Sequence, residues 1–278
     1  MQPKQLALLS DLDGTLFNSE GRISPENAAA IREFIKAGGL FSIATGREPR
    51  NALQYLEGVP MNAPAIVLNG AGVYDYGTGS YLFLKHLDTP RLYPFFSALL
   101  ARFPEADMQI YTAEEGIVYV TPEEQAQPGL LKLHQPCRFI PLDALRCEYI
   151  KSMMYVPAEK QPELKAYLME GEAAGLFHIV PGTAFFNGVQ YHYYETMPNG
   201  VNKGEALAYL KALPAFHGRI TVAFGDYWND EEMLRAADIP VCPENAEPAL
   251  KALCPWVGPD NNSHLLRSFI RERMPLLS

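Results

Sequence analysis

Short apolar runs alternate with segments of helical periodicity at the start of the chain. Three of these runs have the length of buried strands, at residues 6–10, 40–45 and 65–70. The segment 24–39 places its apolar side chains on one helical face, and Ser24 and Pro25 supply an N-cap and a first helical position. A second helix is expected around residues 50–56. Strands that alternate with helices predict βαβ units and a parallel sheet.

The last third of the chain repeats this alternation. Helices are expected at 203–213, 229–238, 247–254 and 264–274, and strands at 219–226 and 239–242. The middle differs, because its several β-like stretches are interrupted by only two helical segments, 91–103 and 159–173. We therefore predict an α/β core made of residues 1–83 and 190–278, with an α+β domain, residues 84–189, inserted into it.

Composition narrows the class of protein. The 278 residues are 48% hydrophobic and carry a net charge of −9, which is ordinary for a globular protein with a real core and argues against nucleic-acid binding. The four cysteines show no metal-binding spacing, which predicts reduced thiols in a cytoplasmic protein. No apolar run has the length of a membrane span and no signal peptide is visible, so no membrane partner is expected.

Polar side chains gather where the predicted strands end. Asp11 and Asp13 follow the first apolar run. The segments "SIATGR" and "GDYWND" place further polar groups after strands, and "VNKGEAL" places one at a helix start. In open parallel sheets, ligands bind beyond the carboxyl ends of the strands, so these four segments are expected to converge on one site.

The chemical inventory of these segments indicates phosphoryl transfer. Three acids, Asp11, Asp13 and Asp226, are suited to a hard divalent cation such as Mg²⁺, which prefers oxygen ligands. A hydroxyl, free backbone N–H groups and Lys203 are suited to a phosphoryl group. Catalysis of phosphoryl transfer is chiefly positioning and charge neutralisation. Two-residue spacing points Asp11 and Asp13 to the same side, where a cation between them and the substrate relieves their repulsion.

Each element has a structural alternative when taken alone. A pair of aspartates two residues apart is common, Thr45 and Gly46 simply end a strand, Lys203 fits a solvated helix position, and the last segment fits a turn with an aspartate N-cap. Arg47 has two open interpretations, binding of an anion or capping of the next helix. Asn69 fits a turn that lies near the site. The joint occurrence of the segments, in this order, favours the catalytic interpretation.

Taken together, the motifs resemble those of the haloacid dehalogenase-like superfamily, specifically its Cof-type sugar-phosphatase branch. The resemblance rests on "DLDGTL" (11–16), "SIATGR" (42–47), "VNKGEAL" (201–207) and "GDYWNDEEML" (225–234), with "LNGAGVYD" (68–75) as a weaker match. It covers residues 1–82 and 190–278. It implies a Rossmann-like, doubly wound parallel sheet with an inserted α+β cap domain. The short stretch between Asp11 and Thr45 has no room for a cap, whereas the stretch between Thr45 and Lys203 does.

The resemblance also implies catalytic and metal-binding roles. Asp11 is similar to the family's nucleophile, which accepts the phosphoryl group as an aspartyl-phosphate. Asp13 corresponds to the general acid/base, which protonates the leaving alkoxide and then activates water. Asp226, the Asp11 carboxylate and the Asp13 carbonyl are implied as Mg²⁺ ligands.

Phosphate binding falls to a second group of residues under the same resemblance. Lys203 neutralises the nucleophile and the transferring group, and the Thr45 hydroxyl with the N–H groups of Leu12 and Gly46 binds phosphate oxygens. Asn229 and Asp230 complete the phosphate and metal shell, with less defined roles.

The sequence therefore predicts a Mg²⁺-dependent phosphatase that acts on a small phosphorylated metabolite, as a monomer or homodimer. Two alternatives remain open: phosphoryl transfer like that of phosphomannomutase, and a non-catalytic sensor of phosphorylated ligands. Two departures from the family, the bulky Tyr227–Trp228 pair and His264 in place of a glycine, affect no catalytic position.

Overall fold

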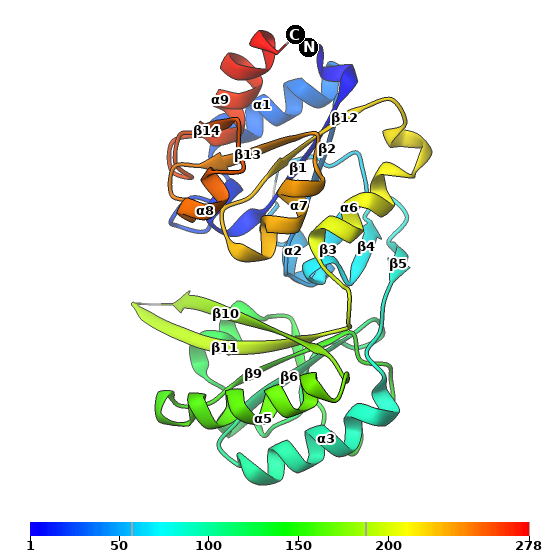
Figure 1. Cartoon of the computed structure of the whole chain (residues 1–278), viewed down its shortest axis with the longest axis vertical. Helices are drawn as coiled ribbons and strands as arrows, with labels where there is room; N and C mark the ends of the chain where they lie inside the picture. The colour runs from blue at the N-terminus through cyan, green and yellow to red at the C-terminus, as the bar shows by residue number, and fades with distance from the viewer. Residues whose placement is uncertain (57, 187, 278) are drawn as a thin grey trace. The chain divides into compact units, whose positions relative to one another are not determined.

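The chain forms two compact units. The computed structural model describes residues 1–56, 58–186 and 188–277, coloured along the chain in Figure 1. The first unit comprises Met1–Phe83 and Asn202–Ser278, and the second comprises Leu84–Val201. Each unit has its own sheet and its own hydrophobic core.

A five-stranded parallel sheet forms the centre of the first unit. Its strand order is β14-β13-β12-β1-β2, and every pairing is parallel. The strands are β1 (Leu6–Ser10), β2 (Leu40–Ile43), β12 (Ile220–Phe224), β13 (Ile239–Pro243) and β14 (Trp256–Gly258). The neighbouring strands β1 and β12 come from opposite ends of the chain, and all five residues of β1 are buried. The carboxyl ends of distant segments therefore meet at one edge of the sheet.

Helices cover both faces of this sheet, which confirms the predicted doubly wound, Rossmann-like core. The helices are α1 (Pro25–Lys36), α2 (Pro49–Leu53), α6 (Lys203–Lys211), α7 (Glu231–Ala236), α8 (Pro248–Lys251) and α9 (Leu265–Ser268). Side chains of α6, α7 and α8 pack with Leu9 and Ala223 in one core cluster. On the opposite face, Phe224 meets Phe269, just after α9, with ring centroids 5.2 Å apart. The predicted cap of α1 forms, since Ser24 accepts a hydrogen bond from the Asn27 N–H.

The expected third strand is shorter than predicted and belongs to a separate sheet. β3 (Ala65–Val67), β4 (Gly72–Asp75) and β5 (Ser80–Leu84) form a three-stranded sheet. β3 only touches the end of β2, where the Thr45 N–H donates to the Ile66 carbonyl at 2.9 Å. The strand stops at Val67 because Leu68 and Asn69 both adopt a left-handed backbone with φ of 53°.

The second unit is built on a six-stranded mixed sheet. Its strand order is β10-β11-β9-β6-β7-β8, with β7 and β8 parallel and the other pairs antiparallel. The strands are β6 (Asp107–Thr112), β7 (Gly116–Tyr119), β8 (Cys137–Phe139), β9 (Lys151–Tyr155), β10 (His178–Phe186) and β11 (Val189–Met197). The helices are α3 (Thr89–Arg102), α4 (Pro128–Leu133) and α5 (Gln161–Ala173). α3 and α5 share a core with the sheet, where the tilted rings of Phe95 and Tyr167 have centroids 4.9 Å apart.

The predicted return to the α/β core at residue 190 is too early. That position lies inside β11, which pairs antiparallel with both β10 and β9. Because removing β11 would break the sheet of the second unit, the chain leaves this unit only after Val201. The alternation of apolar residues predicted a strand at β11, but it could not predict that this strand pairs with β9 and β10.

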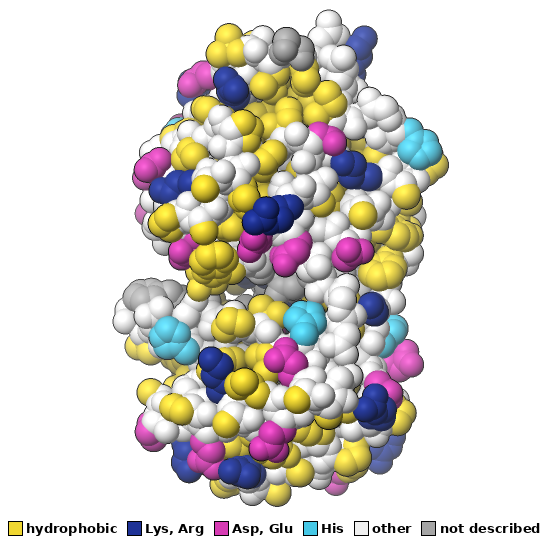
Figure 2. Space-filling model, in the orientation of Figure 1, with side chains coloured by type: hydrophobic (Ala, Val, Ile, Leu, Met, Phe, Trp, Pro, Cys, Tyr) yellow, Lys and Arg dark blue, Asp and Glu magenta, His cyan; other side chains and the backbone are white. Residues whose placement is uncertain are grey.

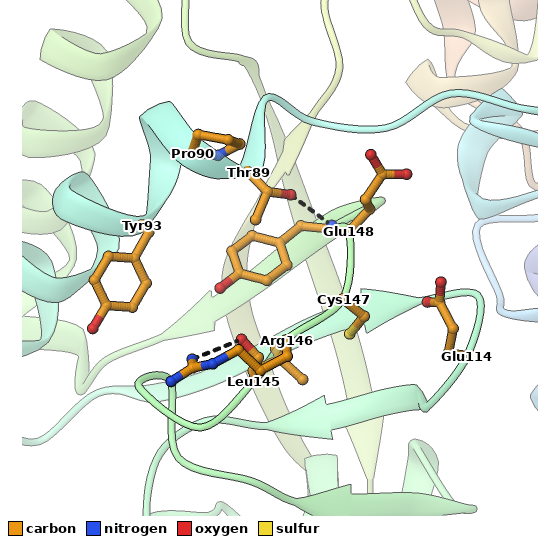
Figure 3. Close-up of a pocket in the computed structure, with 9 residues that line it drawn as sticks. Thr89, Pro90, Tyr93, Glu114, Leu145, Arg146, Cys147 and Glu148 are labelled. Carbon is orange, nitrogen blue, oxygen red and sulfur yellow. Dashed lines mark hydrogen bonds between the residues drawn. The ribbon is translucent and has the colours of Figure 1, made fainter.

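The second unit also carries a hollow of about 560 Å³ (Figure 3). Tyr93 of α3 and the half-buried Cys147 line it, and the Thr89 hydroxyl accepts a hydrogen bond from the Tyr149 N–H beside it. None of the site residues predicted from the sequence lines this hollow.

Surface charge is mixed. On the face drawn in Figure 2, Lys and Arg side chains lie among Asp and Glu side chains instead of forming one basic patch. Among the described residues, the helices are all too short or too polar to traverse a bilayer.

Candidate active site

Asp11 lies directly beyond β1, at the carboxyl end of the parallel sheet. Its backbone N–H donates to the Phe224 carbonyl at 2.9 Å and so continues the pairing of β1 with β12. Its side chain is almost fully buried, and its Oδ1 accepts a hydrogen bond from Lys203 Nζ at 2.7 Å. The first and third predicted motifs are therefore in direct contact.

Lys203 is the first residue of α6 and is completely buried. It donates to Asp11 at 2.7 Å and to Asp230 Oδ1 at 2.6 Å. The start of this helix packs closely on Gly70, where an added Cβ would lie 2.9 Å from the Lys203 backbone nitrogen. Burial lowers the pKa of Lys203 because it disfavours the charged ammonium group. The nearby carboxylates of Asp11 and Asp230 have the larger combined effect, so the pKa is raised overall. The lysine therefore stays protonated between the two acids.

A tight turn after β12 holds Asp226 and Asp230 together. Asp230 Oδ2 accepts hydrogen bonds from the backbone N–H groups of Asp226 at 3.0 Å and Tyr227 at 3.2 Å. Gly225 allows this closure, since an added Cβ would lie 2.5 Å from the Asp230 Cβ. Thr15 donates to Asp226 Oδ1 at 2.6 Å and orients that carboxylate.

The site holds more buried negative charge than its one lysine offsets. Carboxylate oxygens of Asp11, Asp226 and Asp230 all lie within 4.8 Å of one another. Burial raises the pKa of Asp11 well above its usual value, although Lys203 opposes the rise. Burial, helped by Asp230, raises the pKa of Asp226 to about 7. Several carboxylate oxygens that lie close together and carry more negative charge than Lys203 offsets are suitable ligands for a hard divalent cation.

The Asp13 side chain does not belong to this cluster of three carboxylates. It is 60% exposed, and Arg47 binds both its oxygens through Nε at 2.8 Å and Nη2 at 2.7 Å. The guanidinium group also donates to Asn51 and lies 4.5 Å from the Tyr55 ring centroid. Arg47 therefore forms an ion pair with the chain's own Asp13 and does not cap the next helix. Glu48 caps α2 instead.

Thr45, Gly46, Asn69 and Asn229 lie together at the ends of β2 and β3. The Thr45 carbonyl accepts a hydrogen bond from the Asn69 N–H at 3.0 Å. An added Cβ on Gly46 would lie 2.8 Å from Asn69 Oδ1, and the same oxygen accepts from Asn229 Nδ2 at 3.1 Å. Asn69 therefore connects the Thr45 segment to the turn that carries Asp226.

Comparison with protein families gives a match over residues 8–270 to the model of the haloacid dehalogenase-like hydrolases. The chain belongs to this family. The resemblance drawn from the motifs, including that to the Cof-type branch, is confirmed.

Similar sequences cover nearly the whole chain. A putative phosphatase of Streptococcus pyogenes, M6_Spy0533, is 30% identical over 94% of this chain and 96% of its own length. The HMP-PP phosphatase of Serratia proteamaculans is 28% identical over 88% and 86%, and the pyridoxal phosphate phosphatase YbhA of Escherichia coli is 24% identical over 95% and 97%.

Solved structures share the fold. TM0651 of Thermotoga maritima superposes with a TM-score of 0.79 at 21% identity, covering 99% of this chain and 97% of that one. The subclass IIB sugar phosphatase BT4131 superposes with a TM-score of 0.73 at 19% identity, covering 98% and 99%.

Two contributors to the site of this haloacid dehalogenase-like hydrolase were missed in the sequence. Thr15 stands two residues after Asp13, and this position beside the aspartate pair is the signal that marks its hydroxyl as a candidate. Asn245 donates to the Gly14 carbonyl at 2.8 Å, and no motif surrounds it. Asp230, predicted with a less defined role, is instead a central contact of Lys203.

The structure shows the surroundings of the two departures from the family pattern, His264 and the Tyr227–Trp228 pair. His264 adopts a left-handed backbone with φ of 62°, which explains why a glycine is usual there in this family. Its Nδ1 lies 2.9 Å from the Ser24 hydroxyl. Tyr227 and Trp228 are about half exposed, and the Tyr227 N–H still closes the turn onto Asp230.

Proposed function

We propose that this hydrolase is a Mg²⁺-dependent phosphatase that transfers the phosphoryl group of a small metabolite to Asp11 and then to water. One observation carries the proposal. A carboxylate at the end of the first strand touches a fully buried lysine at 2.7 Å, with two further carboxylates within 4.8 Å. Phosphoryl transfer needs a nucleophile next to groups that neutralise negative charge, and here these groups are the Lys203 ammonium group and the candidate metal site.

Asp11 and Asp13 carry the covalent steps of the proposal. An Asp11 oxygen attacks phosphorus, the bond to the leaving oxygen breaks, and Asp13 donates a proton to the alkoxide that leaves. A water molecule then attacks phosphorus and gives a proton to Asp13. The bond between phosphorus and the Asp11 oxygen breaks, which releases phosphate and regenerates the Asp11 carboxylate. Arg47 holds the Asp13 carboxylate by two hydrogen bonds, so in this proposal Asp13 leaves Arg47 and takes up a proton from solvent before it acts as the acid.

Lys203 and the cation offset the negative charge. Lys203 contacts Asp11 and Asp230 and keeps a positive charge beside the attacking oxygen. We assign the cation to the Asp11 and Asp226 carboxylates and the Asp13 carbonyl, with Asp230 supporting the Asp226 turn. When bound, Mg²⁺ supplies neutralisation of the charge on the phosphoryl oxygens.

The Thr45 segment is proposed as the phosphate cradle. The Thr45 hydroxyl and the N–H groups of Gly46 and Leu12 are assigned to phosphate oxygens, with Asn229 beside them. Gly46 has no room for a Cβ, which keeps the backbone close to the site. Asn69 supports this cradle through its contact with Asn229.

The names of the relatives support the substrate class. They include phosphatases of HMP-PP, of pyridoxal phosphate and of 5-amino-6-(5-phospho-D-ribitylamino)uracil, all of them small phosphorylated molecules. We assign the second unit as the cap that supplies contacts to the leaving group and excludes water.

A substrate screen tests the proposal. The protein is incubated with Mg²⁺ and a panel of phosphorylated metabolites in ¹⁸O-labelled water, beside Asp11→Asn and the remote control Asp143→Asn. We expect label in free phosphate, loss of turnover in Asp11→Asn, and unchanged turnover in the control. Phosphoryl retention on a product would indicate a mutase, and binding without turnover would indicate a sensor.

A further inference from the structure

Two of the four cysteines face each other beside β13 of the parallel sheet. Cys242 lies in β13, Cys254 follows α8, and their sulfur atoms are 2.9 Å apart with both thiols free. The sequence gives no hint of this pairing, because eleven residues and a helix separate the two cysteines. Neither thiol takes part in the proposed reaction.

The backbone on both sides of the pair is fixed. Cys242 is in register with Val257 of β14, and the Cys254 N–H donates to the Lys251 carbonyl at 3.1 Å. Cys242 and Leu250 belong to one buried core cluster, and Cys254 packs against it. A disulfide bond is about 2.05 Å long, so the sulfur atoms need to approach by only about 1 Å to form one.

The two thiols differ in a way that suits sequential oxidation. Cys242 is fully buried, whereas Cys254 is partly exposed and open to a small oxidant. A hydrogen bond with the Cys242 thiol lowers the pKa of Cys254, while burial opposes the change. The thiolate is the reactive form of cysteine, so Cys254 is the sulfur that reacts first.

We propose that Cys242 and Cys254 form a reversible disulfide when the protein meets a hydroperoxide. The Cys254 thiolate attacks a peroxide oxygen, the O–O bond breaks, and a sulfenic acid and hydroxide form. The Cys242 sulfur then attacks the Cys254 sulfur, the S–O bond breaks, and the departing hydroxide takes up the Cys242 proton as water. In total, two thiols and one hydrogen peroxide give one disulfide and two waters. A dithiol reductant reverses the reaction by exchange.

The bond would close a loop that supports the candidate active site. Residues 243–253 lie between the two cysteines. Within them, Asn245 donates to the Gly14 carbonyl at 2.8 Å, and the Glu247 N–H donates to the Asp226 carbonyl at 3.0 Å. Oxidation would therefore restrict a segment that touches the loops of both the nucleophile and the third acid.

Mass spectrometry tests the bond itself. The variant Cys137→Ser/Cys147→Ser keeps only the pair and is treated with equimolar hydrogen peroxide, unfolded, alkylated and digested. We expect neither Cys242 nor Cys254 to be alkylated, and we expect a digestion product in which a disulfide links the two residues. Dithiothreitol should restore both thiols. Adding Cys254→Ser should leave Cys242 open to alkylation. Two alkylated thiols after peroxide, or a linkage between molecules only, would overturn the proposal; mapping the unmutated protein guards against a variant that misfolds.

Hydrogen exchange tests the effect on the loop without depending on the phosphatase assignment. The Glu247 amide should exchange more slowly in the oxidised protein and regain its rate after reduction. An unchanged rate in protein that carries the disulfide would show that the bond does not restrict the segment.

Discussion

Replacing Gly14 with alanine tests whether the Asp11 loop and the Asp226 turn are packed as closely as the structure shows. Gly14 has a left-handed backbone with φ of 81°, and an added Cβ would clash with the Asp226 Oδ2 and lie 2.8 Å from the Asp226 Cγ. Ordinary contact between such atoms is about 3.5 Å or more, so the carboxylate must retreat by about 1 Å. Thr15 and the backbone contacts of the turn oppose this movement.

The expected loss has two parts. The left-handed conformation costs alanine about 1–2 kcal/mol of stability. Misplacing a catalytic group by about 1 Å costs on the order of 10²-fold in rate. Gly14→Ala should therefore lower kcat/KM about a hundredfold and weaken Mg²⁺ binding, while the protein stays folded.

Gly21→Ala is the matched control. Gly21 has a similar φ of 71°, but nothing lies within 4 Å of an added Cβ. It should lose comparable stability and keep its activity. The assay is phosphate release against substrate and Mg²⁺ concentration, with circular dichroism to check folding. Gly14→Ala within twofold of the unmutated protein would refute the reasoning, as would equal losses of activity in both variants.

Three further predictions concern charged groups. Lys203→Met leaves two buried carboxylates unpaired, so the free energy of unfolding in urea should fall by about 3–5 kcal/mol; a loss below 1 kcal/mol would contradict the buried contacts. Arg47→Lys loses the two-pronged grip on Asp13 and should lower kcat about tenfold with little change in KM, and an unchanged kcat would remove the positioning role. Burial raises the pKa of Asp107 to about 6 from a usual 3.8, so ionisation of this carboxyl should lower the free energy of unfolding by about 2 kcal/mol as the pH rises from 4 to 6, and the fall should be smaller by that amount in Asp107→Asn, whose other buried acids still titrate. Unfolding curves across this pH range check the last prediction, and parallel profiles would contradict it.

The sequence predicted which segments meet at the sheet edge because that part of the fold follows a simple physical rule. Parallel strands carry their carboxyl ends to one edge, so Asp11 and Asp226 had to meet once β1 and β12 were neighbours. The start of α1 was equally visible, since Ser24 is a strong N-cap residue.

The misses came from features that have no local pattern. Leu68 and Asn69 are left-handed because of their tertiary setting, so the end of β3 was placed too late. The edge strand β14 has only three residues and no periodicity. The boundary at 190 failed because strand pairing is a long-range property, and Asn245 reaches the site from a loop without a motif.

The proposed nucleophile can be tested directly by trapping the covalent intermediate. The enzyme is mixed with Mg²⁺ and an accepted substrate, quenched in acid within the first turnover, digested and analysed by mass spectrometry. The account predicts one added phosphoryl group on the peptide that contains Asp11, at that residue, and none in Asp11→Asn. A phosphoryl group on any other residue, or turnover in Asp11→Asn at the rate of the unmutated enzyme, would contradict it.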